Sequence, residues 1–327
     1  ADPRFNELDF ARLAVERFGT DQHEYLVTPQ DVLKLIHSLP QIYDEPLGNA
    51  SVVAAYYCAQ LAREQGVQTL LGGDGGDEIF GGNERYVSNL VFKKYADLPA
   101  WFRRGLFEPL LRLTPARGPF YKARRYVRRA NMPNPRRFYS YNLLAESDNA
   151  TIFQPDFLQQ IDSDCFFQRA QQVYDQAAPA AETDRLLYLD MKFTITDNDL
   201  RKVTQMVEAA GLQVRYPLLD RDLVDFTGTI PPALKVKPGK NRYIFKQAMR
   251  GFLPDGIIHK SKHGMGLPIA SWLREDKQLN RLLEDNLFSP SARVLNYVRP
   301  EYLEQLKQNF YSDTSTTFYG DNLWVFL

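Results

Sequence analysis

The chain has 327 residues with 40 basic and 40 acidic side chains, and 44% of its residues are hydrophobic. This composition excludes disordered, collagen-like and disulfide-stabilised proteins. No run approaches the roughly 18 apolar residues that span a membrane, and no basic-then-apolar leader opens the sequence. We therefore expect a cytoplasmic protein without a membrane partner. The two cysteines, Cys58 and Cys165, are too far apart for a CxxC pair, so we expect reduced, buried thiols.

The first quarter of the sequence predicts helices and strands in alternation. In chain order we expect a helix from Phe5 closed by Gly19, a strand at 23–27, a helix capped by Thr28 and running to about Leu39, a loop at 43–49, a helix from Asn49 to Glu64 ended by Gly66, and an apolar strand at 67–71. That strand leads directly into the glycine loop, residues 72–82 (GGDGGDEIFGG). Helix, strand and glycine loop are typical of α/β nucleotide-binding folds, in which ligands bind at the carboxyl ends of parallel strands.

The remaining three quarters are predicted to be almost entirely helical. The pattern from Glu84 to Leu327 is that of helices broken by proline and glycine. We place a domain boundary within residues 112–137, which divides an α/β core (residues 1–111) from a helical region (residues 112–327). The chain begins at Ala1 without an initiator methionine, directly before a helical pattern. We interpret it as the C-terminal part of a larger protein, with an expression scar as the alternative.

The stretch from Trp101 to Arg137 is strongly basic. It holds eleven Lys or Arg residues and one acid, Glu108, against 29 basic and 39 acidic groups in the rest of the chain. Such a stretch could form a nucleic-acid face, a solvated helical surface, or a face docked on an acidic neighbour. The chain has zero net charge and carries no RRM, KH, zinc-finger or helix-turn-helix signature. We therefore predict that it has no nucleic-acid partner.

The glycine loop is the most informative segment. Six of its eleven residues are glycine, and Asp74, Asp77 and Glu78 lie among them. Backbone N–H groups in such a turn can bind an anion. Carboxylates repel phosphate unless a cation lies between them, and Mg²⁺ is the natural bridge. The spacing does not match a Walker A loop, a Rossmann fingerprint or an EF-hand. The structural alternative is a tight turn with helix-capping aspartates.

Two later segments also carry candidate residues. Residues 239–268 hold Lys240, Arg242 and Lys246 and then a basic loop with His259, Lys260, Lys262 and His263. A lysine on a glycine-adjacent loop can stabilise charge that develops on phosphate, whereas an exposed basic loop is the structural alternative. No acid or cysteine completes a zinc set with the two histidines.

The second of these segments, residues 197–220, reads as a helix, a break at Gly211 and an extended stretch. Here we favour a structural role in which Arg215 and Asp220 lock the segment to a neighbouring element.

Together these segments resemble the synthetase domain of the glutamine-dependent asparagine synthetases. The family pattern S-G-(D/E)-G-(G/S)-D-E-(I/L/V)-F-G-G is similar to residues 72–82, and N-D-L-x-x-K-V-D-R-M…L-E-V-R-x-P-x-L-D is similar to residues 198–220. The pattern G-K…L-P-x-x-I-x-x-R-x-K-x-G-F-G-x-P is similar to residues 239–268, and the family D-E-P loop matches residues 44–46. The resemblance covers residues 5–273, whereas residues 279–327 carry no motif.

The resemblance implies a fold and a reaction. The fold is α/β but predominantly helical: a truncated parallel-sheet domain of the adenine-nucleotide α-hydrolase (PP-loop) type with a large helical C-terminal part. The reaction is asparagine synthase chemistry, in which ATP activates a carboxylate as an acyl-adenylate that ammonia from glutamine then attacks. The implied catalytic residues are Lys262 and Asp74. The implied ATP- and pyrophosphate-binding residues are Gly73, Gly75, Gly76, Asp77 and Glu78, and Asp77 also handles Mg²⁺.

The chain departs from the family in three ways. Thr204 and Gln205 replace a frequent Asp-Arg pair, so the acceptor is either aspartate or another carboxylate, such as one on a sugar or a peptide. The N-terminal glutaminase domain and the S-G-G-x-D-S pyrophosphate loop are missing, so we expect the isolated chain to be inactive. The first strands of the family sheet are missing with them. Unpaired strand edges favour a homo-oligomer, a swapped partner or a rearranged sheet.

A rival interpretation is a non-catalytic fragment that binds a nucleotide or a partner.

Overall fold

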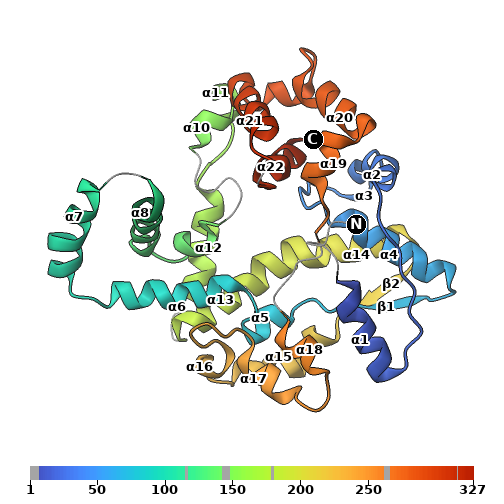
Figure 1. Cartoon of the computed structure of the whole chain (residues 1–327), viewed down its shortest axis with the longest axis horizontal. Helices are drawn as coiled ribbons and strands as arrows, with labels where there is room; N and C mark the ends of the chain where they lie inside the picture. Colours follow the sequence, from blue (N-terminus) through green and yellow to red (C-terminus); the bar gives the residue numbers. More distant parts are fainter. Residues whose placement is uncertain (1–6, 115–116, 142–147, 178–179, 261–265, 315) are drawn as a thin grey trace.

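The computed structural model describes residues 7–114, 117–141, 148–177, 180–260, 266–314 and 316–327. Most of these residues are helical, and two short strands form a small parallel sheet (Figure 1). This confirms the expectation of a predominantly helical chain with parallel strands. None of the helices in the described ranges is long and apolar enough to cross a membrane.

The elements follow one another with short connections; η2, η3 and η5 are π-helical, and η4 and η6 are 3-10 helices. In chain order they are α1 (Leu8–Phe18), α2 (Pro29–Ile36), α3 (Leu39–Ile42), α4 (Val52–Glu64), β1 (Thr69–Leu71), α5 (Gly76–Phe80), α6 (Glu84–Ala96), η2 (Trp101–Phe107), α7 (Glu108–Leu113), α8 (Gly118–Ala130), α9 (Arg136–Tyr139), α10 (Asn149–Ile152), α11 (Pro155–Leu158), α12 (Cys165–Gln176), α13 (Glu182–Asp190), η3 (Met191–Asp199), α14 (Leu200–Ala209), β2 (Gln213–Arg215), η4 (Pro217–Leu219), α15 (Arg221–Gly228), α16 (Pro232–Lys235), α17 (Tyr243–Ala248), α18 (Asp255–His259), α19 (Ile269–Glu275), α20 (Lys277–Leu283), η5 (Glu284–Phe288), η6 (Arg293–Asn296), α21 (Pro300–Ser312) and α22 (Phe318–Phe326).

The sheet brings two distant parts of the sequence together. Strands β1 and β2 run parallel, and Leu70 lies opposite Val214 in the register. Side chains on a strand alternate between its faces, so Leu70 and Val214 point together into a small core formed with α4 and α14. Leu71 faces the other way and is 71% exposed. The sheet therefore has one covered face, and the carboxyl ends of both strands lead to the same edge.

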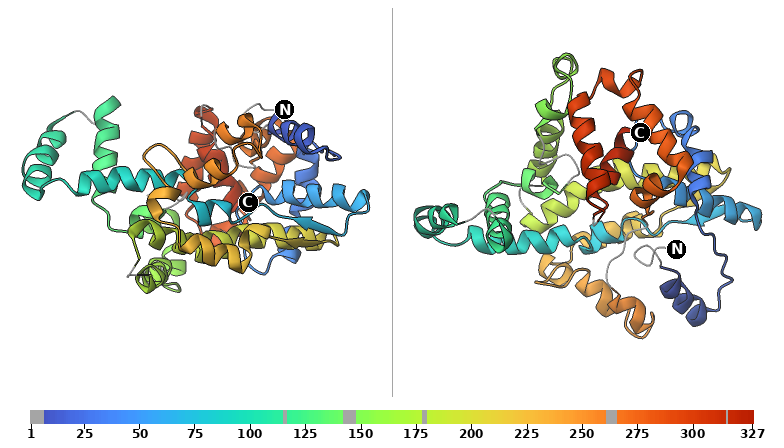
Figure 2. Two further views of the ribbon diagram at one scale, coloured as in Figure 1. Left: turned by 90° about the horizontal axis from the view of Figure 1, so that it is seen from below. Right: turned by 45° about the horizontal axis from the view of Figure 1, so that its top comes forward.

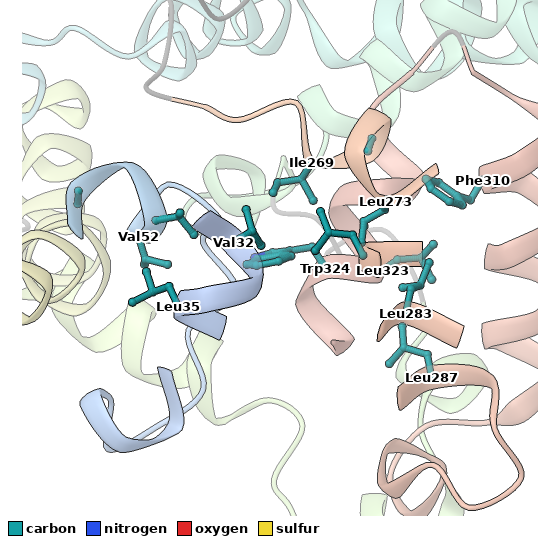
Figure 3. Close-up of a cluster of buried hydrophobic side chains, with 14 of the residues drawn as sticks. Val32, Leu35, Val52, Ile269, Leu273, Leu283, Leu287, Phe310, Leu323 and Trp324 are labelled. Atoms are coloured by element: carbon teal, nitrogen blue, oxygen red, sulfur yellow. The ribbon is translucent and has the colours of Figure 1, made fainter. Parts of the chain in front are cut away.

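The largest core joins the two ends of the chain. Val32 and Val52 of the N-terminal helices pack in one cluster with Leu273, Leu283 and Trp324 of the C-terminal helices (Figure 3). Residues 279–327, which carry no motif, thus complete the hydrophobic core around α2 and α4. The division between residues 1–111 and 112–327 stays a prediction, since this core draws on both ranges.

Most of the early elements agree with the sequence patterns. α1 ends where Gly19 adopts a left-handed conformation, and α2 begins after a capping box between Thr28 and Asp31. α4 and β1 lie within their predicted ranges, although each begins two or three residues late.

Two predictions are wrong. Residues 23–27 form no strand; instead Tyr25 stacks on Tyr57 with ring centroids 5.2 Å apart and donates a hydrogen bond to Asp31 at 3.0 Å. These contacts tie the segment to α2 and α4, and no neighbouring strand pairs with it among the described residues. The two thiols are free, as expected, but both are exposed rather than buried, because each lies on a face of its helix that does not pack inwards.

Candidate functional site

The glycine loop starts at the carboxyl end of β1. The N–H of Gly72 donates to the carbonyl of Arg215 at 2.8 Å, which extends the pairing with β2 by one residue. Gly75 then turns the chain at a φ of +94°, a conformation that favours glycine, and α5 begins at the next residue. Asp77 and Glu78 therefore lie in the first turn of α5, and the N–H of Gly82 donates back to the carbonyl of Asp77 at 2.8 Å.

A cavity of about 260 Å³ lies against this loop. It brings the three sequence segments together, because the loop, the helix η3 and the segment before α17 all contribute walls. The lining residues are Gly73, Asp74, Gly75, Gly76, Asp77, Glu78, Ile195, Asp199, Leu218, Arg242 and Phe245. The structure thus gathers every predicted loop residue in one cavity, although their roles are not tested by this. It adds Asp199 and Phe245, which the sequence patterns did not single out, and Arg242, which was noted only as one residue of a basic segment and was assigned no role.

A larger cavity of about 900 Å³ is lined by the side chains of Arg85, Tyr139, Phe166 and others, including Thr194 of η3. It contains none of the predicted site residues. Size alone would favour it, but four of its ten lining residues are aromatic and it lacks the loop's glycines and acids, so we take the smaller cavity as the candidate site.

Gly82 is required by the position of Asp77. A Cβ atom added at Gly82 would lie 1.7 Å from Oδ1 of Asp77 and 2.9 Å from Cδ of Arg242. Any side chain at this position would push the carboxylate out of place. The last glycine of the loop therefore makes room for the Asp77 side chain, whereas Gly73 has no atom within 4 Å of its added Cβ.

Arg242 is the cation of the cavity. Its Nη1 lies 3.4 Å from Oδ1 of Asp77, and its backbone N–H donates to the carbonyl of Gly81 at 3.2 Å. It adopts a φ of +49°, which is unusual for a residue with a side chain. Its Nε is buried and has no hydrogen-bond partner among the residues that the structure describes. Burial, together with the Arg242 charge nearby, lowers the pKa of Lys246 one helical turn further on.

Two carboxyl groups of the loop have raised pKa values. Burial raises the pKa of Glu78 from 4.5 to about 8, and the carboxylates of Asp77 and Asp190 add to the shift. Burial also raises the pKa of Asp74, with Lys202 opposing the shift and Asp199 reinforcing it. At neutral pH the Glu78 side chain is therefore mainly protonated, so it can donate a hydrogen bond.

Residues of the segment 197–220 contact the glycine loop and the cavity next to it. Nζ of Lys202 lies 2.9 Å from Oδ1 of Asp199, which lines the cavity. The hydroxyls of Thr204 and Tyr216 are 2.8 Å apart, and the Tyr216 ring lies against Gly72, whose added Cβ would meet it at 2.6 Å. Thr204, a departure from the family pattern, thus helps to fix the ring on which the loop rests.

The expectation for Arg215 and Asp220 holds in part. Arg215 does connect its segment to a neighbour, through backbone pairing with β1. Asp220 instead caps α15, the helix that follows it, by accepting hydrogen bonds from the N–H groups of Asp222 and Leu223 at 3.0 and 3.4 Å. Its role is local because an aspartate directly before a helix satisfies the free N–H groups of the first turn.

The remaining predicted residues fall outside the cavity or outside the described ranges. Lys262, and His263 beside it, lie outside the described residues, so the lysine assignment stays a prediction. Lys260 is described, and its Nζ lies 2.7 Å from Oε2 of Glu7. The D-E-P loop has a structural contact, since Asp44 and Glu45 both form ion pairs with Arg201 of α14.

The carboxylates of the cavity could hold a magnesium ion only if a bound phosphate group supplied further ligands to the same ion. Within the described ranges, no group of three His, Cys, Asp or Glu side chains is arranged to hold a metal. Mg²⁺ commonly takes just one or two carboxylates and completes its shell with substrate phosphates and water. Asp77, in the first turn of α5 and at the cavity wall, is the residue that fits this role, and Glu78 could join it after losing its proton.

Comparisons with known proteins show to which family the chain belongs. The profile of the family described as asparagine synthase matches residues 1–327. The chain is 24% identical to asparagine synthetase (glutamine-hydrolyzing) 1 of Bacillus subtilis over 328 residues, which cover 99% of this chain and 49% of the relative. It is 24% identical to asparagine synthetase (glutamine-hydrolyzing) 3 of the same organism over 249 residues, or 76% of this chain and 34% of the relative. It thus spans about half the length of the first relative and about a third of the second. The chain belongs to the asparagine synthase family.

Proposed function

We propose that the chain supplies the synthetase part of an ATP-dependent amide synthesis, of asparagine synthase type, in the cytoplasm. The observation that carries this proposal is the cavity at the carboxyl end of β1. Its described lining combines a glycine-rich backbone, four acids and one arginine around about 260 Å³. Glycine N–H groups and a cation suit a polyphosphate, and the acids suit the metal that accompanies it. A PP-loop type of sheet, with nucleotide at the strand ends, is part of the same proposal.

The reaction has two balanced steps. A carboxylate oxygen of the acceptor attacks the α-phosphorus of ATP, the α–β bridging bond breaks, and an acyl-adenylate and pyrophosphate form. Ammonia then attacks the acyl carbon, AMP leaves with the electron pair of the C–O bond, and one proton is released as the amide forms. Ammonia would come from glutamine through a glutaminase domain of the kind indicated by the names of the relatives.

Each candidate residue has a separate proposed role in this reaction. Arg242 holds the Asp77 carboxylate at 3.4 Å and so fixes its direction. Mg²⁺, when bound there, would neutralise charge on the pyrophosphate. Asp74 has a raised pKa and so tends to hold a proton more tightly than an exposed aspartate, which suits a group that takes a proton from attacking ammonia. Lys262 is proposed, on the family pattern alone, to stabilise charge during adenylation.

The acceptor is proposed to be aspartate, with a carboxylate on a sugar or peptide as the second candidate. The second candidate rests on two residues of α14. Thr204 and Gln205 stand where the family often has an Asp-Arg pair, and Oε1 of Gln205 is buried with no partner among the described residues. Two neutral side chains thus replace a charged pair on α14.

Oxygen-isotope transfer tests the proposal. An acceptor whose carboxylate carries ¹⁸O is incubated with the full-length protein, ATP, Mg²⁺ and ammonia. Transfer of one ¹⁸O atom into AMP is expected, because the attacking oxygen stays on the α-phosphorus. Appearance of the label in inorganic phosphate, with ADP as the other product, would replace adenylation by acyl-phosphate chemistry. Nucleotide binding without acceptor-dependent AMP for either class of acceptor would instead support a non-catalytic role.

A further inference from the structure

The segment from α6 to α8 forms an arm that stands away from the rest of the molecule. Helix α6 leads outward, η2 and α7 form the far part, and α8 returns toward the body (Figures 1 and 2). The arm has a small core of its own, in which Phe92, Tyr95, Leu111, Val127 and Ala130 pack together. Inward-facing apolar residues on α6, α7 and α8 are thereby accounted for, so the exposed apolar residues on the arm need another explanation.

The arm exposes a second set of large apolar side chains. Leu110 is 55% exposed and Leu113 is 84% exposed, and Trp101 at the start of η2 is 72% exposed. Leu106, Leu110 and Leu113 follow a spacing of four and three residues, which places neighbouring side chains on one helical face. The other exposed large apolar side chains of the arm are Val91, Leu98, Phe107, Phe120 and Tyr121. Buried Leu111 faces the arm's core, so the exposed leucines form a separate apolar face that points outward.

The charges on η2, α7 and α8 are mainly positive. Arg104, Arg112, Arg117 and Lys122 are exposed on the same helices. Glu108 is the sole acid between residues 101 and 137. Its carboxylate is half-buried and accepts hydrogen bonds from the Tyr95 hydroxyl and the Asn131 amide, each at 2.9 Å. The outer surface of the arm therefore combines aliphatic side chains, aromatic side chains and cations.

We propose that this arm docks on the surface of an anionic lipid bilayer. Helices with a leucine and tryptophan face flanked by Arg and Lys bury that face at the boundary of headgroups and acyl chains, and the cations attract anionic lipid. Charge complementarity distinguishes this occupant from a neutral surface. The three exposed leucines distinguish it from nucleic acid, which offers phosphates and stacked rings but no hydrocarbon layer. The arm would attach peripherally, with its apolar face at the boundary of headgroups and acyl chains. This inference does not depend on the proposed reaction, and it differs from the expectation, drawn from the sequence, that the chain has no membrane partner.

Vesicle binding of the 327-residue chain tests the proposal. The chain is titrated with vesicles of phosphatidylcholine containing 30 mol% phosphatidylglycerol, and with vesicles of phosphatidylcholine alone. We expect binding to the anionic vesicles that weakens as salt is raised, with much weaker binding to neutral ones. Trp101 provides a direct signal, since its emission should shift to the blue as its ring leaves water. Of the other two tryptophans, Trp324 is buried and Trp272 packs against the main core, and a Trp101→Phe variant should bind but lose the shift.

Two matched pairs of variants separate the contributions. Replacing Arg104 and Arg112 together by Gln should weaken partitioning about 30-fold, since one cation near an anionic bilayer is worth roughly a fivefold change. The same exchange at Arg221 and Arg281, which are exposed on α15 and α20, alters the net charge equally and should have little effect.

The apolar pair tests the leucine face. Replacing Leu110 and Leu113 by Ala should lower partitioning at least about tenfold, whereas Leu26→Ala, at an aliphatic side chain that is 62% exposed elsewhere, should not. Equal binding to neutral vesicles, equal losses in the control variants, or no shift of Trp101 emission would each overturn the proposal. So would tighter binding to a duplex or single-stranded oligonucleotide than to the anionic vesicles, because that would assign the arm to nucleic acid.

Discussion

A methyl group at Gly82 should disable the loop while leaving the fold intact. The added Cβ would lie 1.7 Å from Oδ1 of Asp77, and contacts of this kind shorter than 3.0 Å essentially do not occur, so the carboxylate must move by more than 1 Å. Misplacement by about 1 Å commonly costs a factor of about 10² in rate. The stability cost is small, because Asp77 can leave its preferred rotamer for about 0.5–1.5 kcal/mol and Gly82 does not need a left-handed φ.

The matched control is Gly73→Ala in the same loop. Gly73 lines the same cavity, but its added Cβ would meet no atom within 4 Å. We expect acceptor-dependent ATP–pyrophosphate exchange by the full-length protein to fall about 10²-fold in Gly82→Ala and to stay within about threefold of the original in Gly73→Ala. Urea unfolding should place both variants within about 1–2 kcal/mol of the parent. If the two variants lost activity equally, or if Gly82→Ala were fully active, the position of Asp77 would not matter and this reasoning would fail.

Three further outcomes concern two acids of the glycine loop and the lysine predicted from the family pattern. Asp77→Asn should abolish exchange with little change in melting temperature, since its partly exposed ion pair is worth about 1 kcal/mol or less; normal magnesium dependence in the variant would refute the metal role. Lys262→Ala should slow adenylate formation by about 10²–10³, whereas Lys260→Ala, which breaks an ion pair with Glu7, should do much less; the reverse order would shift the family alignment by two residues. Glu78→Gln should gain stability relative to the parent as pH rises from about 4.5 to about 8 and then level off, because the folded parent holds a proton that the unfolded chain has released; urea-unfolding curves whose difference does not change with pH would contradict the buried, protonated state.

The sequence indicated the parts of the fold that depend on local rules. The capping box of Thr28 and Asp31, the glycine that ends α1, and the apolar strand before the glycine loop all act within a few residues. The strand predicted at 23–27 has the right residues but no pairing partner, and a strand exists only with a neighbour to bond to. β2, in contrast, is three residues long and was recognised only as an extended stretch. Its partner lies more than 140 residues away in the chain, and no local pattern records that distance.

The candidate site shows the same division between local and non-local information. Asp74, Asp77 and Glu78 could be found because they stand among glycines directly after a strand. Arg242 could not, because what makes it a site residue is its 3.4 Å contact with Asp77, across more than 160 residues of sequence. One signal was present: Arg242 follows Gly239, Lys240 and Asn241 in a turn, where a positive φ is common. It indicates an unusual backbone but not the partner.

Arg242 also shows why the loop needs more than its own sequence. The residue holds a φ of +49° and buries a guanidinium nitrogen without a partner, two features that each cost free energy. The surrounding contacts hold it there: its N–H bonds to Gly81, Asn241 donates to the carbonyl of Gly82 at 2.8 Å, and Phe245 stacks on Phe80 with centroids 4.7 Å apart. Unfavourable geometry that is held by several independent contacts is characteristic of sites selected for function rather than stability. Nε of Arg242 is buried beside a cavity lined by acids and has no partner in the described part of the chain, so it is a donor from which a bound anion can accept a hydrogen bond.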